Sequence, residues 1–146
     1  MVEVFQFIAV LSCALFSGAA IYINFAEHPA RMECGVELAA TVFGPSYRRA
    51  ATMQVLLAMT AAMTGLVSWW LDGRLMWLIG TIMIFAVIPF TLLAIMPTNK
   101  KLLAPDLNRA SEATRSLLQK WGKLHTVRSV LSLAAACIFL WLIVRP

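Results

Sequence analysis

The sequence predicts an all-α integral membrane protein: a four-helix bundle with an additional interfacial amphipathic helix between its third and fourth spans. Hydrophobic residues make up 61% of the 146 residues and charged residues only 13%, whereas soluble proteins carry about 25% charged residues. Four stretches reach the roughly 20 apolar residues that a helix needs to cross about 30 Å of hydrocarbon: residues 4–25, 50–71, 75–95 and 124–144. Most Lys and Arg residues lie in or beside the two long connections. We therefore expect residues 1–146 to form a single membrane domain.

The first span, residues 4–25, has some features of a cleavable signal. Its start is acidic, at Glu3, and it lacks a clean small-x-small cleavage site, so we expect a retained transmembrane helix. Polar residues at its end recur at i, i+3, i+4 and i+7, which would place them on one face of a continuing helix: Asn24, Glu27, His28 and Arg31. Pro29 leaves a second possibility open, because a residue before proline avoids helical dihedrals and the proline then begins a new short helix.

The second and third spans, residues 50–71 and 75–95, are joined by a tight turn around Gly73. Three tryptophans flank this turn, as expected of an aromatic belt at the level of the lipid headgroups: Trp69, Trp70 and Trp77.

Residues 106–121, in the connection between the third and fourth spans, have an apolar face and a charged face. The apolar face recurs at helical spacing: Leu107, Ala110, Thr114, Leu117, Leu118 and Trp121. Charged residues oppose it: Arg109, Glu112, Arg115 and Lys120. This pattern predicts a helix that lies in the membrane interface with its apolar side down, and it leaves open a role as a lid over a polar site.

The fourth span begins with Trp121, His125 and Arg128 at i, i+4 and i+7, so these side chains share one helix face. A guanidinium about one turn inside the hydrocarbon is costly unless it faces the bundle interior and meets a polar partner. Glu27 or the Asn24 carbonyl is the expected partner of Arg128. The first and fourth helices should therefore be neighbours.

The distribution of positive charge predicts the orientation in the membrane. The side of the two long connections holds ten of the 12 Lys and Arg residues, and the other side holds only Arg74 and Arg145. Because cytoplasmic loops carry the excess of Lys and Arg, we expect both termini outside the cytoplasm, in a bacterial inner membrane. Orientation and anionic lipid explain the basic charge, and no aromatic ladder suited to nucleic acid accompanies it.

These residues together resemble the anthrone-oxygenase-like family of small four-helix membrane proteins. The resemblance rests on their order along the chain: Asn24, Glu27, His28, Pro29 and Arg31 after the first span, Pro97, Thr98 and Asn99 after the third, and Trp121, His125 and Arg128 at the fourth. Fungal members oxidise an anthrone to an anthraquinone. The resemblance implies the bundle fold and, for activity, an oxidation of an aromatic substrate.

We expect one pocket on the cytoplasmic side, acting on a hydrophobic aromatic or phenolic molecule. The expected catalytic residues are His125, His28, Glu27 and Arg128, and the expected substrate-binding residues are Asn24, Arg31, Tyr47, Asn99 and Trp121. A histidine base would remove a phenolic or benzylic proton while Arg128 or Asn99 holds the oxyanion. The carbanion can then react with oxygen without a cofactor.

The sequence is compatible with more than one cofactor and more than one class of function. One variant places haem b or a metal between His28 and His125, although the chain has no His or Cys pair at metal-ligand spacing, and its three cysteines form no disulfide or metal motif. A different class of function is a non-catalytic accessory protein that recognises an anionic lipid headgroup, haem or a partner protein. Small residues in the spans leave a homo-oligomer open.

Overall fold

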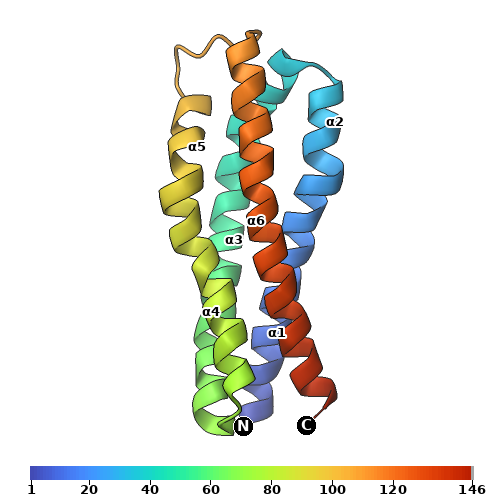
Figure 1. The fold of residues 1–146 in the computed structure, drawn as a ribbon, viewed down its shortest axis with the longest axis vertical. Helices are drawn as coiled ribbons and strands as arrows, with labels where there is room; N and C mark the ends of the chain where they lie inside the picture. The colour runs from blue at the N-terminus through green and yellow to red at the C-terminus, as the bar shows by residue number, and fades with distance from the viewer. Residues whose placement is uncertain (146) are drawn as a thin grey trace.

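The computed structural model describes residues 1–145, and this part of the chain is helical without strands. Its elements follow in the order α1 (Val2–Tyr22), η1 (Ile23–Glu27), α2 (His28–Glu33), α3 (Val36–Asp72), α4 (Leu75–Phe90), η2 (Thr91–Ile95), α5 (Met96–Leu102) and α6 (Glu112–Val144). The η segments are π-helical turns inside longer helices. The elements therefore join into four continuous helical rods, Val2–Glu33, Val36–Asp72, Leu75–Leu102 and Glu112–Val144 (Figure 1). Each rod is long and apolar enough to cross a membrane. The predicted all-α, four-span membrane fold is confirmed.

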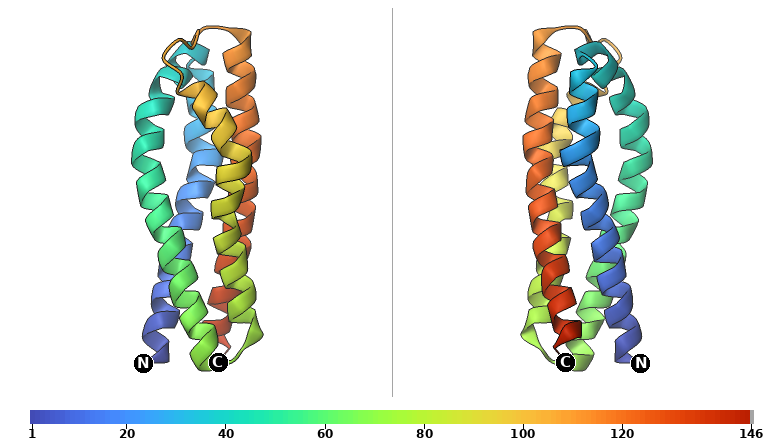
Figure 2. Two further views of the ribbon diagram at one scale, coloured as in Figure 1. Left: turned by 90° about the vertical axis from the view of Figure 1, so that its left-hand side faces the viewer. Right: turned by 90° about the vertical axis from the view of Figure 1, so that its right-hand side faces the viewer.

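The four rods run alternately up and down the long axis of the bundle (Figures 1 and 2). Both termini and the α3–α4 turn lie at one end, which we call the terminal end. The α2–α3 and α5–α6 connections lie at the opposite end, which we call the loop end. Helix α1 packs against α3 and α6, and α4 packs against the same two helices. The predicted contact between the first and fourth spans is therefore confirmed.

The separate interfacial helix expected at residues 106–121 is absent. Residues 103–111 form a loop, and Ser111 caps the next helix by accepting a hydrogen bond from the Thr114 backbone N–H at 3.2 Å. Helix α6 then runs from Glu112 to Val144 without a break. From Thr114 onward the apolar face that predicted a helix on the membrane surface belongs to this long helix, and Leu118 is buried in the bundle, whereas Leu107 and Ala110 lie in the loop.

The bundle core has two hydrophobic clusters. The cluster in the terminal half contains mostly small side chains around Phe16, Trp77 and Phe139, and Gly80 allows the ring of Phe139 to approach the α4 backbone closely. The cluster in the loop half includes Phe43 and its neighbours on α5 and α6. Residues of both clusters line a cavity between them, so the fold leaves an internal space in the loop half of the membrane span.

Candidate functional site

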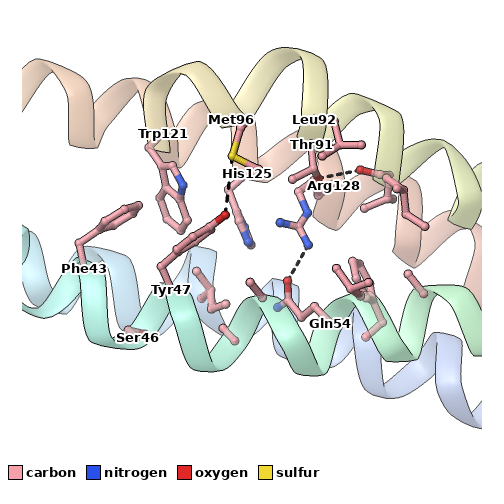
Figure 3. Close-up of a pocket in the computed structure, with 18 of the residues that line it drawn as sticks. Phe43, Ser46, Tyr47, Gln54, Thr91, Leu92, Met96, Trp121, His125 and Arg128 are labelled. Carbon is pink, nitrogen blue, oxygen red and sulfur yellow. Dashed lines mark hydrogen bonds between the residues drawn. The ribbon is translucent and has the colours of Figure 1, made fainter. Parts of the chain in front are cut away.

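The cavity has a volume of about 130 Å³ and lies among α3, η2, α5 and α6 (Figure 3). Most of its lining is apolar, including Phe43, Val87 and Met96. Its polar lining residues are Arg31, Ser46, Tyr47, Gln54, Thr91, Trp121, His125 and Arg128. On this measure one water molecule needs about 10 to 15 Å³, so the cavity has room for part of an organic ligand.

His125 lies in the cavity wall and is only 1% exposed. Its Nδ1 is 2.8 Å from Asn24 Oδ1, which also accepts a hydrogen bond from Ser129 Oγ at 2.6 Å. The Asn24 amide nitrogen donates to Gly122 O at 3.2 Å and to Thr126 Oγ1 at 3.0 Å. These contacts fix Asn24 with its oxygen toward His125, so His125 Nδ1 carries the hydrogen. The lone pair of the neutral imidazole is then on Nε2, which is the basic atom of the site.

The π-helical turn η1 positions Asn24 toward α6. A π turn is rare and holds one more residue than an α turn, so it changes the direction in which its side chains point. Pro29 follows η1 at the start of α2. Because proline has no backbone N–H to donate to the preceding turn, the wider turn accommodates it without ending the helix. The chain stays helical through His28, so the continuous helix, and not the break, is the correct alternative.

Arg128 has a neutral partner. Its Nη2 donates to Gln54 Oε1 at 2.6 Å, its guanidinium lies 5.4 Å from the centre of the Phe16 ring, and its buried Nε has no partner within the described residues. The expectation that Glu27 or Asn24 pairs with Arg128 is wrong. Among residues 1–145 no carboxylate forms a salt bridge with this guanidinium.

Glu27 instead pairs with Arg31, four residues later on the same rod. Arg31 also donates to Ser46 Oγ at 2.7 Å, and Ser46 Oγ donates to Glu27 Oε1 at 3.1 Å. The three side chains connect α2 to α3 near the loop end of the cavity. Arg31 and Ser46 line the cavity, whereas Glu27 does not.

His28 and Asn99 lie outside the cavity lining. His28 packs against Trp121, with ring centres 5.2 Å apart, and lines an open groove that also contains Lys123. Asn99 is 1% exposed on α5, and its Oδ1 has no partner within the described residues. Because only His125 of the two histidines lines the cavity, the pair is not arranged as opposite axial ligands of a haem inside it. Residues 1–145 also contain no group of three His, Cys, Asp or Glu side chains suited to a metal ion.

The structure thus brings five predicted site residues to one cavity: Arg31, Tyr47, Trp121, His125 and Arg128. Asn24 does not line the cavity but contacts the Nδ1 of His125. Sequence reasoning missed Gln54, which is 3% exposed and the direct partner of Arg128. An amide inside an apolar span is a signal for a polar contact between helices, and Gln54 lies inside the second predicted span. Ser46 was missed because a serine in a connection has many ordinary roles.

The fold and the cavity define a class of protein: integral membrane four-helix bundles that enclose a mostly apolar cavity with a few polar side chains between their spans. The chain belongs to the anthrone oxygenase family, whose sequence model matches residues 43–138. An anthrone oxygenase of Claviceps purpurea (strain 20.1) is 41% identical over 59 residues, which is 35% of this chain and 34% of that protein. The alignment therefore covers about a third of the relative's length. No solved structure matches the chain. The family match includes Gln54, His125 and Arg128, while Asn24 precedes it.

Proposed function

We propose that this protein is an oxygenase-like enzyme that removes a proton from a hydrophobic aromatic or phenolic substrate and lets the resulting anion react with dioxygen. One observation carries the proposal: an imidazole whose Nδ1 lies 2.8 Å from Asn24 Oδ1 shares a mostly apolar cavity with a guanidinium that pairs with no carboxylate of residues 1–145. An unbalanced cation in a membrane bundle favours an anionic ligand or intermediate. The name of the Claviceps relative agrees with this chemistry.

The first step is proton transfer. His125 Nε2 accepts a proton from a benzylic methylene or a phenol, and the charge of the substrate anion moves onto its conjugated oxygen. Arg128 and the Nε2 of Gln54 are donors for this oxyanion. Asn24 keeps the imidazole in the correct tautomer throughout. His28 and Glu27 have no part in this step because neither lines the cavity.

The second step consumes dioxygen. For a methylene substrate, the carbanion forms a carbon–oxygen bond with dioxygen, and the resulting peroxide anion takes the proton back from the His125 imidazolium. Loss of water then breaks the oxygen–oxygen bond and the remaining carbon–hydrogen bond. One methylene and one dioxygen give one ketone and one water, so the reaction consumes no external reductant.

A hydrophobic substrate reaches this site from the bilayer. Val55 on α3 and Leu92 on η2 both line the cavity, and they are 52% and 57% exposed. Side chains at this height of the bundle face lipid, so the cavity opens sideways between α3 and η2. An apolar ring that is already dissolved in the hydrocarbon enters without first crossing into water.

Replacement of His125 by Gln tests the proposal. Glutamine is polar and of similar size but cannot act as the base, so we expect the turnover number to fall at least about 10²-fold. Oxygen uptake and quinone formation by detergent-purified protein with anthrone as the probe substrate measure this loss. The matched control is His28→Gln, which should retain turnover within a few fold.

The outcomes separate the two classes of function. Unchanged turnover in His125→Gln contradicts the proposed base. If the wild-type protein consumes no oxygen with anthrone or with related phenolic methylene compounds, the oxygenase proposal fails and a non-catalytic binding role gains support.

A further inference from the structure

An open groove lies between the first and fourth spans, outside the cavity and toward the loop end. Residues of η1, α2 and α6 line it, and all but the glycine have polar side chains: Asn24, His28, Gln119, Gly122, Lys123 and Thr126. We call it the α6 groove. The two spans approach closely here, because a Cβ atom at Gly122 would lie 2.7 Å from His28 Nε2. The imidazole therefore forms the inner wall of a polar groove in the side of the bundle.

The α6 groove extends from the level of the lipid headgroups into the hydrocarbon. Gln119 and Lys123 precede the fourth predicted span, residues 124–144, whereas Thr126 lies inside it. Thr126 is exposed, and its Oγ1 accepts a hydrogen bond from Asn24 Nδ2 at 3.0 Å and donates one to Gly122 O at 3.0 Å. Hydrocarbon offers no further partner to such groups, so their exposure to acyl chains is unfavourable. A polar ligand in the groove lowers this cost.

Lys123 gives the groove a positive charge that the described residues do not balance. Its side chain is exposed and takes part in no salt bridge among residues 1–145. The groove lining within this range contains no carboxylate, and Glu27, next to His28 in the chain, is paired with Arg31. Gln119 precedes Lys123 by one helical turn on the same face of α6 and adds amide donors. An ammonium group beside an amide at headgroup level suits a phosphate group.

The same face of α6 becomes apolar further into the membrane. The polar residues Gln119, Lys123 and Thr126 follow one another at spacings of four and three residues. The next two residues at these spacings, Val130 and Leu133, are 60% and 46% exposed. One stripe of the helix thus offers phosphate donors at headgroup level and an apolar surface beside them. This combination suits a phospholipid better than a free phosphate ion.

We infer that the α6 groove binds the phosphate headgroup of one anionic phospholipid. Lys123 Nζ and the side-chain amide of Gln119 are its donors, and an acyl chain lies along Val130 and Leu133. The bound lipid covers the polar contact between the first and fourth spans and stabilises the packing of these helices. The groove shares no lining residue with the cavity, so this inference does not depend on the proposed oxygenase reaction.

Native mass spectrometry of the detergent-purified protein, titrated with single lipids, tests this inference without turnover. The probes are dioleoyl phosphatidylglycerol, which is anionic, and dioleoyl phosphatidylcholine, which has the same acyl chains and no net charge. We expect one tightly bound phosphatidylglycerol, with about fivefold higher affinity than phosphatidylcholine, as expected for one lysine at an anionic headgroup. Equal affinity for the two lipids overturns the inference.

Thermal unfolding in detergent distinguishes a lipid from a free anion. Phosphatidylglycerol should raise the unfolding temperature of the wild-type protein, because a ligand that binds only the folded state stabilises it. Inorganic phosphate at the same concentration should leave the unfolding temperature unchanged. An equal rise with inorganic phosphate would show a site for free anions and overturn the assignment to a phospholipid.

Three variants test the role of Lys123 in the groove. Lys123→Gln removes the charge from an exposed position, so we expect its affinity for phosphatidylglycerol to fall about fivefold, to that for phosphatidylcholine. Lys123→Arg should retain the preference. The matched control is Lys120→Gln, because Lys120 is also exposed on α6 but does not line the groove. Unchanged binding by Lys123→Gln contradicts the site. An equal loss in Lys120→Gln also contradicts it, because the charge of the whole loop end would then hold the lipid.

Discussion

At the scale of single residues, the chemistry of the site depends on one amide. Asn24 uses both hydrogens of its amide nitrogen on α6, at Gly122 O and Thr126 Oγ1, and this leaves its oxygen for His125 and Ser129. Histidine alone does not determine which nitrogen is basic. The hydrogen bond made by the other ring nitrogen determines it, so the basicity of Nε2 depends on the contact between η1 and α6.

Replacement of Asn24 by Leu should separate catalysis from binding. The imidazole loses its orienting acceptor and populates both tautomers, so we expect the turnover number to fall about 10²-fold or more with little change in KM. Asn24→Asp should recover part of the rate because a carboxylate still accepts from His125 Nδ1–H. Thr126→Val, which removes only one of the amide contacts, should remain within a few fold of wild type. A loss in Asn24→Leu confined to KM would contradict the orienting role.

The neutral partner of Arg128 makes a prediction about stability. Removing one member of a buried ion pair costs about 3 to 5 kcal/mol, which is the cost expected if Glu27 were the partner. Because Gln54 is the partner, Arg128→Met removes an unbalanced cation but leaves an amide oxygen unpaired. We expect little net change in the free energy of unfolding, and the double variant with Gln54→Leu should be about 1 to 3 kcal/mol more stable than the single variant.

Thermal and denaturant unfolding in detergent measure these stabilities, and oxygen uptake should show that both variants have lost turnover. A destabilisation of Arg128→Met by about 3 kcal/mol or more would indicate a carboxylate partner for the guanidinium and contradict the site geometry.

At the scale of elements, a π-helical turn followed by a proline occurs twice. Each odd-numbered span of the bundle ends in a five-residue π turn, η1 or η2, and a proline follows two residues after each turn, at Pro29 and Pro97. Both turns are next to the cavity: Ile23 of η1 and Thr91 and Leu92 of η2 belong to its lining. Two helices widened beside the cavity give the bundle room for an internal space in its loop half.

The sequence predicts these elements only in part, for physical reasons. Apolar length alone predicts four spans, because hydrocarbon thickness fixes the number of residues required. Apolar periodicity does not distinguish a helix that lies on the membrane surface from an extension of a membrane-spanning helix. Leu118 and Trp121 recur at helical spacing in both cases. The face shared by Trp121, His125 and Arg128 follows from helix geometry. The role of Gln54 does not, because it depends on which side of α3 faces α6.

The proposed lateral opening between α3 and η2 gives a prediction about access. Val55→Trp places a large ring at the rim, so we expect KM for a hydrophobic substrate to rise about tenfold while the turnover number stays within a few fold. Met59→Trp is the control, because Met59 lies one turn further along α3, is 40% exposed and does not line the cavity. Steady-state oxygen uptake measures both constants. If neither Val55→Trp nor Leu92→Trp changes KM, the substrate does not enter through this opening.

At the scale of the whole molecule, the two ends of the bundle differ in their number of positive charges and in what those charges contact. The two cations of the terminal end are engaged within the protein: Arg74 pairs with Asp72 and donates to the carbonyls of Leu142 and Arg145, and the Arg145 guanidinium lies 4.2 Å from the Trp141 ring centre. The loop half holds the other ten Lys and Arg residues. The structure places the two long connections at a common end (Figure 1), so their charges act on one membrane surface.

This asymmetry predicts that the loop end faces the cytoplasm and both termini face outward, because positively charged segments are retained on the cytoplasmic side. Cysteine labelling of intact cells with a reagent that cannot cross the membrane tests the orientation. Native Cys34 is exposed near the loop end, so a Cys34→Ser background avoids its signal. In that background Glu3→Cys should be labelled, whereas Asn108→Cys should be labelled only after the cells are opened. Glu3 is preferred to the turn residue Gly73 at the same end of the bundle, because a cysteine at the positive φ of 77° found at Gly73 would be strained. Labelling of Asn108→Cys but not Glu3→Cys in intact cells would reverse the orientation, and the site beneath the loop end would then lie on the outer side of the membrane.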